Sequence, residues 1–190
     1  MTPDAESVLP ASHDATSRVE RRWATVCTCL LALLVAVAAF TGSYKATVPQ
    51  ARVETTDPRT LHVTGEFIES NLGSALEPDG SVTVRIVGQQ YSFTPQCILV
   101  PTDTPITFRA ASADVVHGFL IQGTNVNLML VPGYVSILSA RFDKPVESNM
   151  PCHEYCGTGH EGMWARVRVI DKAEFLKLSN QRRRVTCVPK

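Results

Sequence analysis

The sequence predicts an all-β domain, a sandwich or a barrel, that follows a single membrane-spanning helix. Three observations predict this arrangement: a long uncharged apolar run near the N-terminus, a series of short β-branched segments after Ser81, and no helical periodicity across residues 82–170. The chain has 190 residues and a formal net charge of zero. This length allows one domain of ordinary size with extensions. The balanced charge gives no reason to expect a nucleic-acid partner.

The first 22 residues are polar and contain two prolines and few large apolar side chains. Such a segment cannot bury enough apolar surface to offset the entropy lost on ordering. We therefore expect residues 1–22 to form a flexible tail.

Residues 23–44 form the apolar run, with no charged residue between Arg22 and Lys45. A helix of this length spans about 33 Å at about 1.5 Å per residue, which is enough to cross the hydrocarbon of a bilayer. Trp23 and Tyr44 at its ends suit the membrane interface. A cleaved signal peptide is the alternative, but its apolar core is normally shorter and its leading segment is also short. The run therefore favours a retained membrane anchor.

Residues 45–81 contain three prolines and are predicted to be a linker, in which residues 61–76 are compatible with a short helix interrupted by Gly65 and Gly73. After the linker come short segments rich in β-branched and aromatic residues, separated by turn formers, which predict the strands of a sandwich or barrel. These segments are residues 81–88, 96–101, 105–112, 115–123, 134–142 and 163–170. We place the domain at residues 82–170 and expect a basic, solvated tail over residues 171–190.

The segment PCHEYCGTGHEGM, residues 151–163, concentrates side chains that bind metals. Thiolates are soft ligands that suit zinc, copper(I) and iron–sulfur clusters. A structural zinc site needs four ligands, of which Cys152, Cys156 and His160 supply three while Met163 stays idle. A blue-copper site needs one cysteine, two histidines and a weak axial methionine, so that Cys152 would be surplus.

A pair of copper ions bridged by both thiolates uses every donor. Each ion then needs one imidazole and one weak axial ligand. His117, which by itself on an apolar strand indicates a buried structural histidine, supplies the second nitrogen beside His160. The axial contacts come from Met163 and from a backbone carbonyl near Glu154. The sequence therefore predicts a dinuclear copper centre.

Other polar residues near these donors receive structural interpretations. His153, between the two cysteines, is expected to lie outside the set of ligands or to face solvent. Asp114 is compatible with accepting a hydrogen bond near His117 or with simply beginning a strand, and the second interpretation is favoured. Cys97 and Cys187 are compatible with a disulfide in an oxidising compartment or with two free thiols.

The segment CHEYCGTGHEGM resembles the C-x-E-x-C-x-x-x-H-x-x-M signature of the dinuclear copper (CuA) domain in subunit II of cytochrome c oxidase. The segment ADVVHGFLIQGTNVN is similar to the one that brings the first histidine of that family. The resemblance covers residues 81–170, and the single helix before it resembles the one-span, B-type branch. It implies a cupredoxin-like Greek-key fold. The copper ligands that it implies are His117, Cys152, Cys156, His160, Met163 and the main-chain oxygen of Glu154.

The resemblance also implies a function and a location. A cytochrome c or a small copper protein would reduce the copper centre, which would pass electrons to haem in catalytic subunit I, where O2 is reduced and protons are moved. The enzyme would be the complex, anchored once in the bacterial inner membrane with this domain on the periplasmic side. Magnesium at the subunit interface, bound through Glu154, is a further implication. Two alternatives stay open: the copper subunit of a nitric oxide reductase, and a membrane-tethered copper carrier.

The sequence departs from the family in the aromatic stretch that is thought to receive electrons. Relatives often carry several tryptophans there, whereas this chain has VGQQYSFTP. The candidates for receiving electrons are therefore Tyr91, Phe93 and Trp164.

Overall fold

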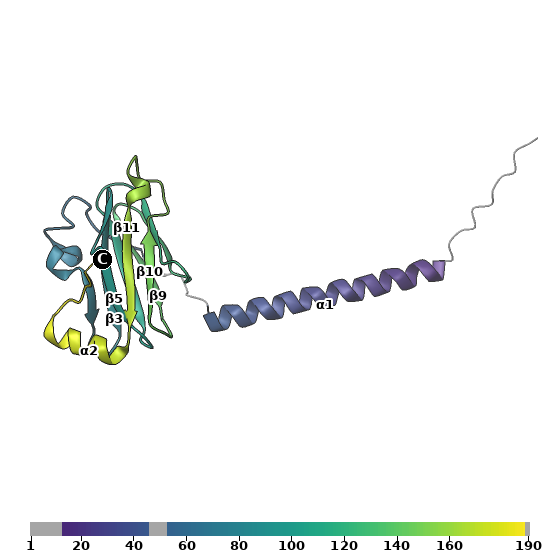
Figure 1. Ribbon diagram of the computed structural model, residues 1–190. Helices are drawn as coiled ribbons and strands as arrows, with labels where there is room; N and C mark the ends of the chain where they lie inside the picture. The colour runs from purple at the N-terminus through teal and green to yellow at the C-terminus, as the bar shows by residue number, and fades with distance from the viewer. Residues whose placement is uncertain (1–12, 46–52, 189–190) are drawn as a thin grey trace, which may run out of the picture. The chain divides into compact units, whose positions relative to one another are not determined.

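The computed structural model describes residues 13–45 and 53–188. The chain divides into two units, residues 1–46 and 47–190. The described part of the first unit is one long helix, and the described part of the second is a β-sandwich with a helix at one end (Figure 1). An all-β domain preceded by one apolar helix is therefore confirmed.

Helix α1 covers His13–Lys45. Within it, residues 17–43 are long and apolar enough to cross a membrane, with a mean hydropathy of 2.4 in the most apolar window. Threonine hydroxyls inside this stretch donate to carbonyls one turn earlier, as Thr28 does to Ala24 and Thr41 to Val37, each at 2.8 Å. These bonds satisfy the hydroxyls without water, which a bilayer core requires.

The expectation of a flexible tail over residues 1–22 was wrong for its second half. Helix α1 begins at His13, ten residues before the apolar run, while residues 1–12 lie outside the described part of the chain. The segment HDATSRVERR contains no glycine or proline, and alanine, arginine and glutamate are good helix formers. A helix that the apolar run has already nucleated therefore extends through it at little cost.

The second unit contains every strand that the sequence predicted, together with others that it did not. The strands are β1 Glu54–Thr55, β2 Gly73–Leu76, β3 Val82–Gln89, β4 Ser92–Thr94, β5 Cys97–Pro101, β6 Ile106–Ser112, β7 His117–Leu120, β8 Asn127–Leu130, β9 Tyr134–Ala140, β10 Val146–Pro151 and β11 Trp164–Ile170. Short helical turns are η1 Gly65–Phe67, η2 Glu69–Asn71 and η3 His160–Gly162, and helix α2 is Lys172–Gln181.

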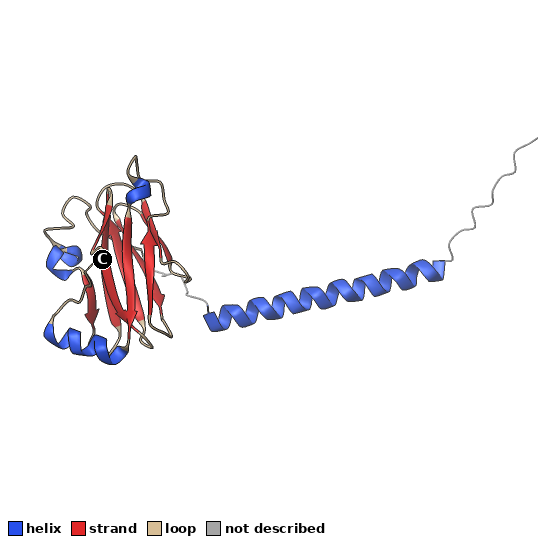
Figure 2. Cartoon of the chain, viewed as in Figure 1, coloured by secondary structure: helices blue, strands red, loops and turns tan. Residues whose placement is uncertain are grey.

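Two sheets face each other across the core (Figure 2). In the described residues, the larger sheet has the order β1-β9-β6-β3-β2, with β4 also on β3, and the smaller has the order β10-β11-β5. The pairs β3–β6 and β5–β11 are parallel, and the other pairs are antiparallel. Strands β7 and β8 form a separate hairpin. Turn η3 and helix α2 lie at opposite ends of the sandwich (Figure 1).

The core is built from the inward faces of both sheets. Val84 and Ile86 of β3 and Phe108 of β6 meet Ile98 of β5 in one fully buried cluster. Such alternation of inward apolar residues is what the two-residue period of a strand dictates. Phe119 of β7 joins this cluster, so the hairpin that begins with His117 is anchored directly to the core.

Residues 53–76, predicted to be part of a linker, belong to the sandwich: β1 and β2 are edge strands of the large sheet, and the residues between them pack on its outer face. The expected short helix is absent from this described stretch, which instead contains β1, the turns η1 and η2, and β2. Leu61, Phe67 and Leu72 form a second buried cluster with Val87 and Ala111. Strand β3 has neighbours on both edges and apolar residues on both faces, so its outer face must also be covered. Residues 46–52 of the expected linker lie outside the described part.

Ion pairs fasten the same segment to the sheet. Arg109 on β6 pairs with Glu54 of β1 and with Glu66 of η1, and Arg85 on β3 also reaches Glu66 with its Nε 3.0 Å from Oε1. The bonds from Glu66, opposed by partial burial, hold the pKa of the Arg109 guanidinium above its usual value. Charged residues on the outer face of a strand therefore bind the segment that covers it.

The C-terminal residues 171–188 are also part of the fold and not a tail, as had been expected. Helix α2 buries Phe175, and the chain then runs between the edges of the two sheets. Val185 pairs with Ser74 of β2, and Thr186 forms a bridge with Ile98 of β5. This segment therefore closes one side of the sandwich by covering two open strand edges. Residues 189–190 lie outside the described part.

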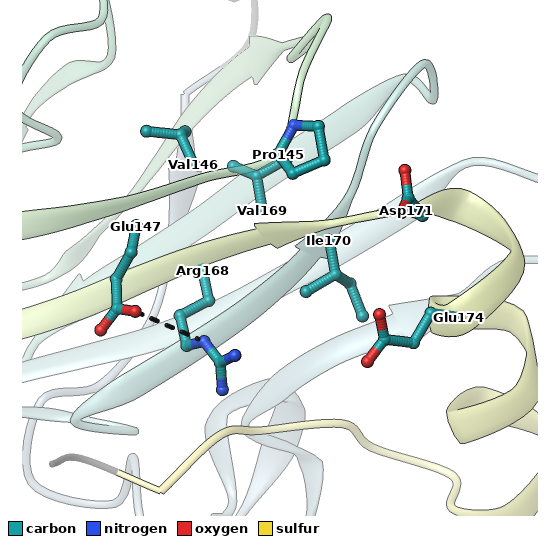
Figure 3. A pocket seen from close by; sticks show the side chains of 8 residues that line it. All are labelled: Pro145, Val146, Glu147, Arg168, Val169, Ile170, Asp171 and Glu174. Atoms are coloured by element: carbon teal, nitrogen blue, oxygen red, sulfur yellow. Dashed lines mark ion pairs between the residues drawn. The ribbon is translucent and has the colours of Figure 1, made fainter.

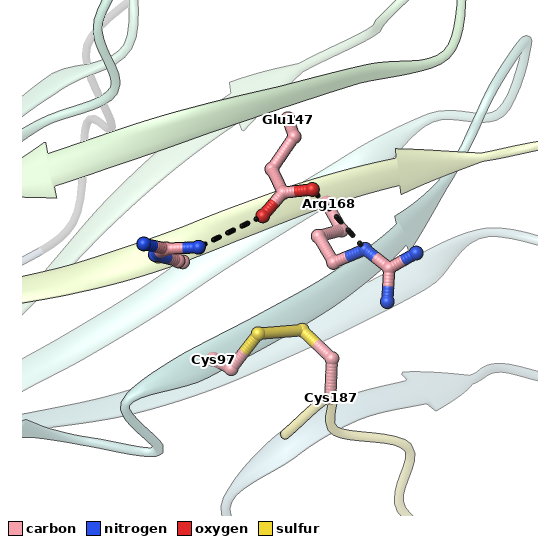
Figure 4. The surroundings of a disulfide bond; sticks show 5 residues. Cys97, Glu147, Arg168 and Cys187 are labelled. Atoms are coloured by element: carbon pink, nitrogen blue, oxygen red, sulfur yellow. Dashed lines mark hydrogen bonds and ion pairs between the residues drawn. A yellow bond between two sulfur atoms is a disulfide. The ribbon is translucent and has the colours of Figure 1, made fainter. Parts of the chain in front are cut away.

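A disulfide between Cys97 and Cys187 secures this closure (Figure 4). The two residues are 90 positions apart in sequence, with their Cα atoms 4.9 Å apart. The backbone N–H of Cys187 also donates to the carbonyl of Cys97 at 3.2 Å. Of the two alternatives for these cysteines, the structure has the disulfide.

Cys187→Ser should reduce the free energy of unfolding of the residue 47–190 unit by about 2–4 kcal/mol, because the bond closes a long loop in the unfolded chain. Urea denaturation followed by circular dichroism measures this difference. Treating the wild-type fragment with a reductant should produce the same loss. Equal midpoints for the variant and the oxidised wild type would contradict the stabilising role of the disulfide.

Candidate metal centre

The cysteine-rich segment is a loop whose two ends are held together by strand pairing. Strand β10 ends at Pro151 and β11 begins at Trp164, and these two residues are partners in the antiparallel ladder. One step further, the N–H of Cys152 donates to the carbonyl of Met163 at 2.9 Å. Residues eleven positions apart in sequence are therefore neighbours, and the loop between them must fold back on itself.

Strand β7 brings His117 to this loop from a distant part of the sequence. Phe119 forms a bridge with Cys152, and the N–H of His153 donates to the carbonyl of Gly118 at 3.0 Å. These contacts extend the β7 backbone along the start of the loop. The His117 side chain is fully buried, with its Nδ1 3.9 Å from the Sγ of Cys152.

The predicted donors converge at one place. The two cysteines are free and buried, with their sulfur atoms 4.0 Å apart. The Sγ of Cys156 lies 3.6 Å from His160 Nδ1 and 3.7 Å from Met163 Sδ. The Sγ of Cys152 lies 3.3 Å from the main-chain oxygen of Glu154. The structure thus brings together all six predicted donors.

These separations fit a shared metal. Two ligand atoms that are each about 2.0–2.3 Å from one ion, at tetrahedral or trigonal angles, lie about 3.5–4 Å from each other. His117, Cys152 and Cys156 have donor atoms that all lie within 4.8 Å of one another. His160 is not part of that group of three, and its Nδ1 lies beside the Sγ of Cys156.

Burial controls the protonation of the Cys156 thiol. Desolvation, followed by the influence of the neighbouring Cys152, raises the pKa of the Cys156 thiol to about 11. Without a metal this thiol therefore keeps its proton at neutral pH. A bound cation replaces that proton and compensates the charge of the thiolate, so metal binding releases protons.

Asp114 holds the imidazole of His117 in place, which is the less favoured of the two alternatives that the sequence offered. Its Oδ1 lies 2.7 Å from Nε2 of His117. A carboxylate accepts here, so Nε2 carries the proton and the lone pair of Nδ1 faces the sulfur atoms. Partial burial raises the pKa of Asp114, but the bonds from Gln90 N–H, His117 and Val115 N–H outweigh it, and the pKa falls below its usual value.

His153 lies outside the converging set, as the sequence interpretation expected. Its ring packs against the backbone of β7, where a methyl group on Gly118 would come within 2.6 Å of it. Its Nε2 is buried and has no hydrogen-bond partner in the described structure, while Nδ1 lies 4.0 Å from a carboxylate oxygen of Glu154. Gly118 therefore allows the close contact between β7 and the loop.

The candidate electron-receiving aromatics occupy different positions. Tyr91 is 39% exposed and its ring covers the loop at Gly159, where a methyl group would come within 2.7 Å of it. Trp164 is 46% exposed and donates from Nε1 to the carbonyl of Glu161 at 2.7 Å. Phe93 is fully buried against Phe119, so it cannot touch a partner protein.

A shallow hollow of about 330 Å³ lies elsewhere, between β10, β11 and the start of α2 (Figure 3). Glu147 and Arg168 form an ion pair on its wall, with Nε 3.8 Å from Oε2. Its lining residues include no histidine, cysteine or methionine. The hollow therefore offers none of the soft donors that the loop provides.

Comparisons with known proteins agree with this geometry. Residues 82–170 match the family model described as "Cytochrome C oxidase subunit II, periplasmic domain". A cytochrome c oxidase subunit 2 of Thermus thermophilus is 30% identical over 160 residues, which are 83% of this chain and 95% of the relative. This chain belongs to the cytochrome c oxidase subunit II family.

Two further matches agree with this family. A heme-copper oxidase subunit 2 of Aeropyrum pernix is 36% identical over 96 residues, which are 50% of this chain and 41% of that protein. A chain in a cryo-EM structure of a heme-copper terminal oxidase dimer has the same fold, with a TM-score of 0.60 and 24% identity over 80% of this chain and 99% of that chain. Subunit II is the copper-bearing part of an oxidoreductase complex, which implies a catalytic subunit as partner.

Asp114→Asn should weaken copper binding by about tenfold or more, because the neutral amide orients His117 less firmly and makes it a weaker ligand. Competition with a copper chelator measures the change. Asp143→Asn, which alters an exposed aspartate in the turn between β9 and β10, is the control. If both variants bind copper like the wild type, the hydrogen bond to His117 does not support the centre.

Proposed function

We propose that this subunit II receives electrons for a haem–copper oxidase through a dinuclear copper centre in the loop. The observation that carries the proposal is the arrangement of the donors around two buried sulfur atoms. Each cysteine has its own imidazole, His117 beside Cys152 and His160 beside Cys156. A single zinc ion bound by both cysteines and both histidines would leave the Met163 thioether and the Glu154 carbonyl without a role.

The proposed ligands divide evenly between two ions. Cys152 and Cys156 would hold both ions, and each ion would gain one imidazole nitrogen. The thioether of Met163 and the carbonyl of Glu154, which lie against different cysteines, would supply the weaker contacts. When bound, the copper pair supplies a one-electron acceptor in which the charge is shared by two metals.

The residues around the loop keep this site dry and rigid. Met163 and His117 are fully buried, and both ends of the loop are held by the β10–β11 ladder. Ligands that cannot move need little rearrangement when the charge at the site changes, which favours rapid electron transfer. Binding, orientation and exclusion of water are thus the contributions of this chain, while oxygen chemistry belongs to the catalytic subunit.

We propose that a cytochrome c or a small copper protein docks on the exposed apolar side chains around the loop. Val116, Tyr155 and Trp164 are exposed and are sequence neighbours of proposed ligands, and Tyr91, also exposed, packs on the loop. Exposed apolar groups gathered in one place are typical of protein-binding surfaces. Tyr91 is the best candidate for receiving the electron, since it is exposed and also packs on the loop.

The same proposal places the domain outside the cytoplasm of a bacterium, with α1 as a single anchor in the plasma membrane. The disulfide supports this placement, because such bonds persist in oxidising compartments.

We also propose that Glu154, whose side chain is 39% exposed, offers its carboxylate to a magnesium ion at the contact with the catalytic subunit. Hard cations such as magnesium prefer carboxylate oxygens.

Replacing either bridging sulfur tests the dinuclear centre. Cys152→Ser and Cys156→Ser should each abolish the electron paramagnetic resonance pattern of an electron shared by two copper nuclei, because one bridge is lost. Cys29→Ser, which changes an exposed thiol of α1, should leave the pattern and two copper ions per chain. A shared-electron pattern that survives in either bridge variant would contradict the assignment.

Tyr91→Leu should slow reduction by the donor protein about tenfold while the copper signal is retained, since exposed aromatic anchors dominate small docking surfaces. Trp164→Leu is the matched variant and should have the smaller effect. Stopped-flow reduction of the copper absorption measures both rates. A larger effect of Trp164→Leu would contradict the choice of Tyr91 and would indicate that Trp164 receives the electron.

A further inference from the structure

The turn between β3 and β4 contacts two of the segments that supply proposed ligands. We infer that Gln90, in this turn, is a positioning residue that holds Cys156 and His117 in a fixed relation to each other. The inference rests on the proposed function, because it assumes that these two residues bind the copper pair. Neither the ligand spacing nor the family match assigns a role to Gln90.

The side chain of Gln90 makes the first contact. Its Nε2 donates a hydrogen bond to the carbonyl oxygen of Cys156. The next residue, Gly157, has a φ of 131°, and a methyl group there would come within 2.9 Å of the same nitrogen. The amide therefore lies directly against the backbone of the loop where it leaves the cysteine, at a point that only glycine accommodates.

The backbone of Gln90 makes the second contact. Its N–H donates to Oδ2 of Asp114 at 2.7 Å, and the other oxygen of that carboxylate accepts from Nε2 of His117. The imidazole that faces Cys152 is thus connected to the carbonyl of Cys156 through Asp114 and Gln90. A displacement of either proposed ligand must move these two residues or break one of the bonds.

The position of Gln90 in the fold suits this role. It directly follows β3, whose Val82, Val84 and Ile86 are fully buried between the two sheets. The loop itself contains Gly157 and Gly159, so it needs restraint from outside. The turn therefore transmits the rigidity of the central strand to the ligands at both sides of the centre.

The bond to Cys156 also has an electrostatic consequence. The amide N–H directs its positive end at the carbonyl of a ligand residue, which stabilises the form of the site that carries the additional electron. A carboxylate at the same position would stabilise the oxidised, more positive form instead. The reduction potential should therefore respond to the charge at position 90, which a purely structural contact would not produce.

The test compares Gln90→Leu and Gln90→Glu with Gln89→Leu in the full-length chain, purified in detergent and loaded with copper. Gln89 is the matched control, because its amide oxygen lies 3.1 Å from His62 and not on the loop. The measurements are the copper-to-protein ratio, the paramagnetic resonance pattern, the reduction potential and the rate of copper loss to a copper(I) chelator.

Gln90→Leu should lose copper about tenfold faster than the wild type, as is typical when a side chain that orients a ligand is removed. Its reduction potential should fall, that of Gln90→Glu should fall further, and Gln89→Leu should match the wild type.

The inference is overturned if both Gln90 variants match Gln89→Leu. It is equally overturned if copper is lost faster while neither potential changes, because Gln90 would then only stabilise the fold. A wild-type chain without a shared-electron signal would overturn the proposed function itself.

Discussion

The pairing of β10 with β11 is the constraint on which the proposed centre depends. It places Pro151 opposite Trp164 and joins Cys152 to Met163 by a backbone hydrogen bond, so that the loop between them returns to its starting point. Two sulfur atoms four residues apart would lie about 13 Å from each other on an extended chain, at about 3.3 Å per residue. The closed loop brings them to 4.0 Å and places an imidazole and a thioether beside them.

The remainder of the sandwich serves to bring a distant residue to this loop and to keep it there. Strand β7 packs Phe119 into the core and runs beside the start of the loop, which positions His117 against Cys152 across 35 residues of sequence. The large sheet is covered on its outer face by residues 56–72, and the sandwich is closed at one side by residues 185–187. The segments outside the family match therefore stabilise the frame without contributing a proposed ligand.

The electrostatics of the site follow from its burial. Burial disfavours the negative charge of a thiolate and so raises the pKa of Cys156. A bound metal cation compensates that charge. Two polar residues form hydrogen bonds to the proposed ligands. Asp114 accepts a hydrogen bond from the imidazole of His117, and Gln90 donates one to the carbonyl of Cys156. An electron-transfer subunit benefits from this arrangement, because ligands and their supports keep their places when the charge changes.

The sequence by itself determined the membrane helix, six strand segments and the donor-rich loop, because these depend on local composition, alternation and spacing. The placement of Asp114 three residues before His117 was a local signal that allowed a hydrogen bond without favouring it, whereas nothing in the sequence pointed to Gln90. Only the tertiary structure decided that Cys97 and Cys187 are joined, that residues 53–76 and 171–188 pack on the sandwich, and that Phe93 is buried. Each of these features is a contact between segments far apart in the chain. The pairing of strands brings such segments together, and no local pattern records which distant residue will face which.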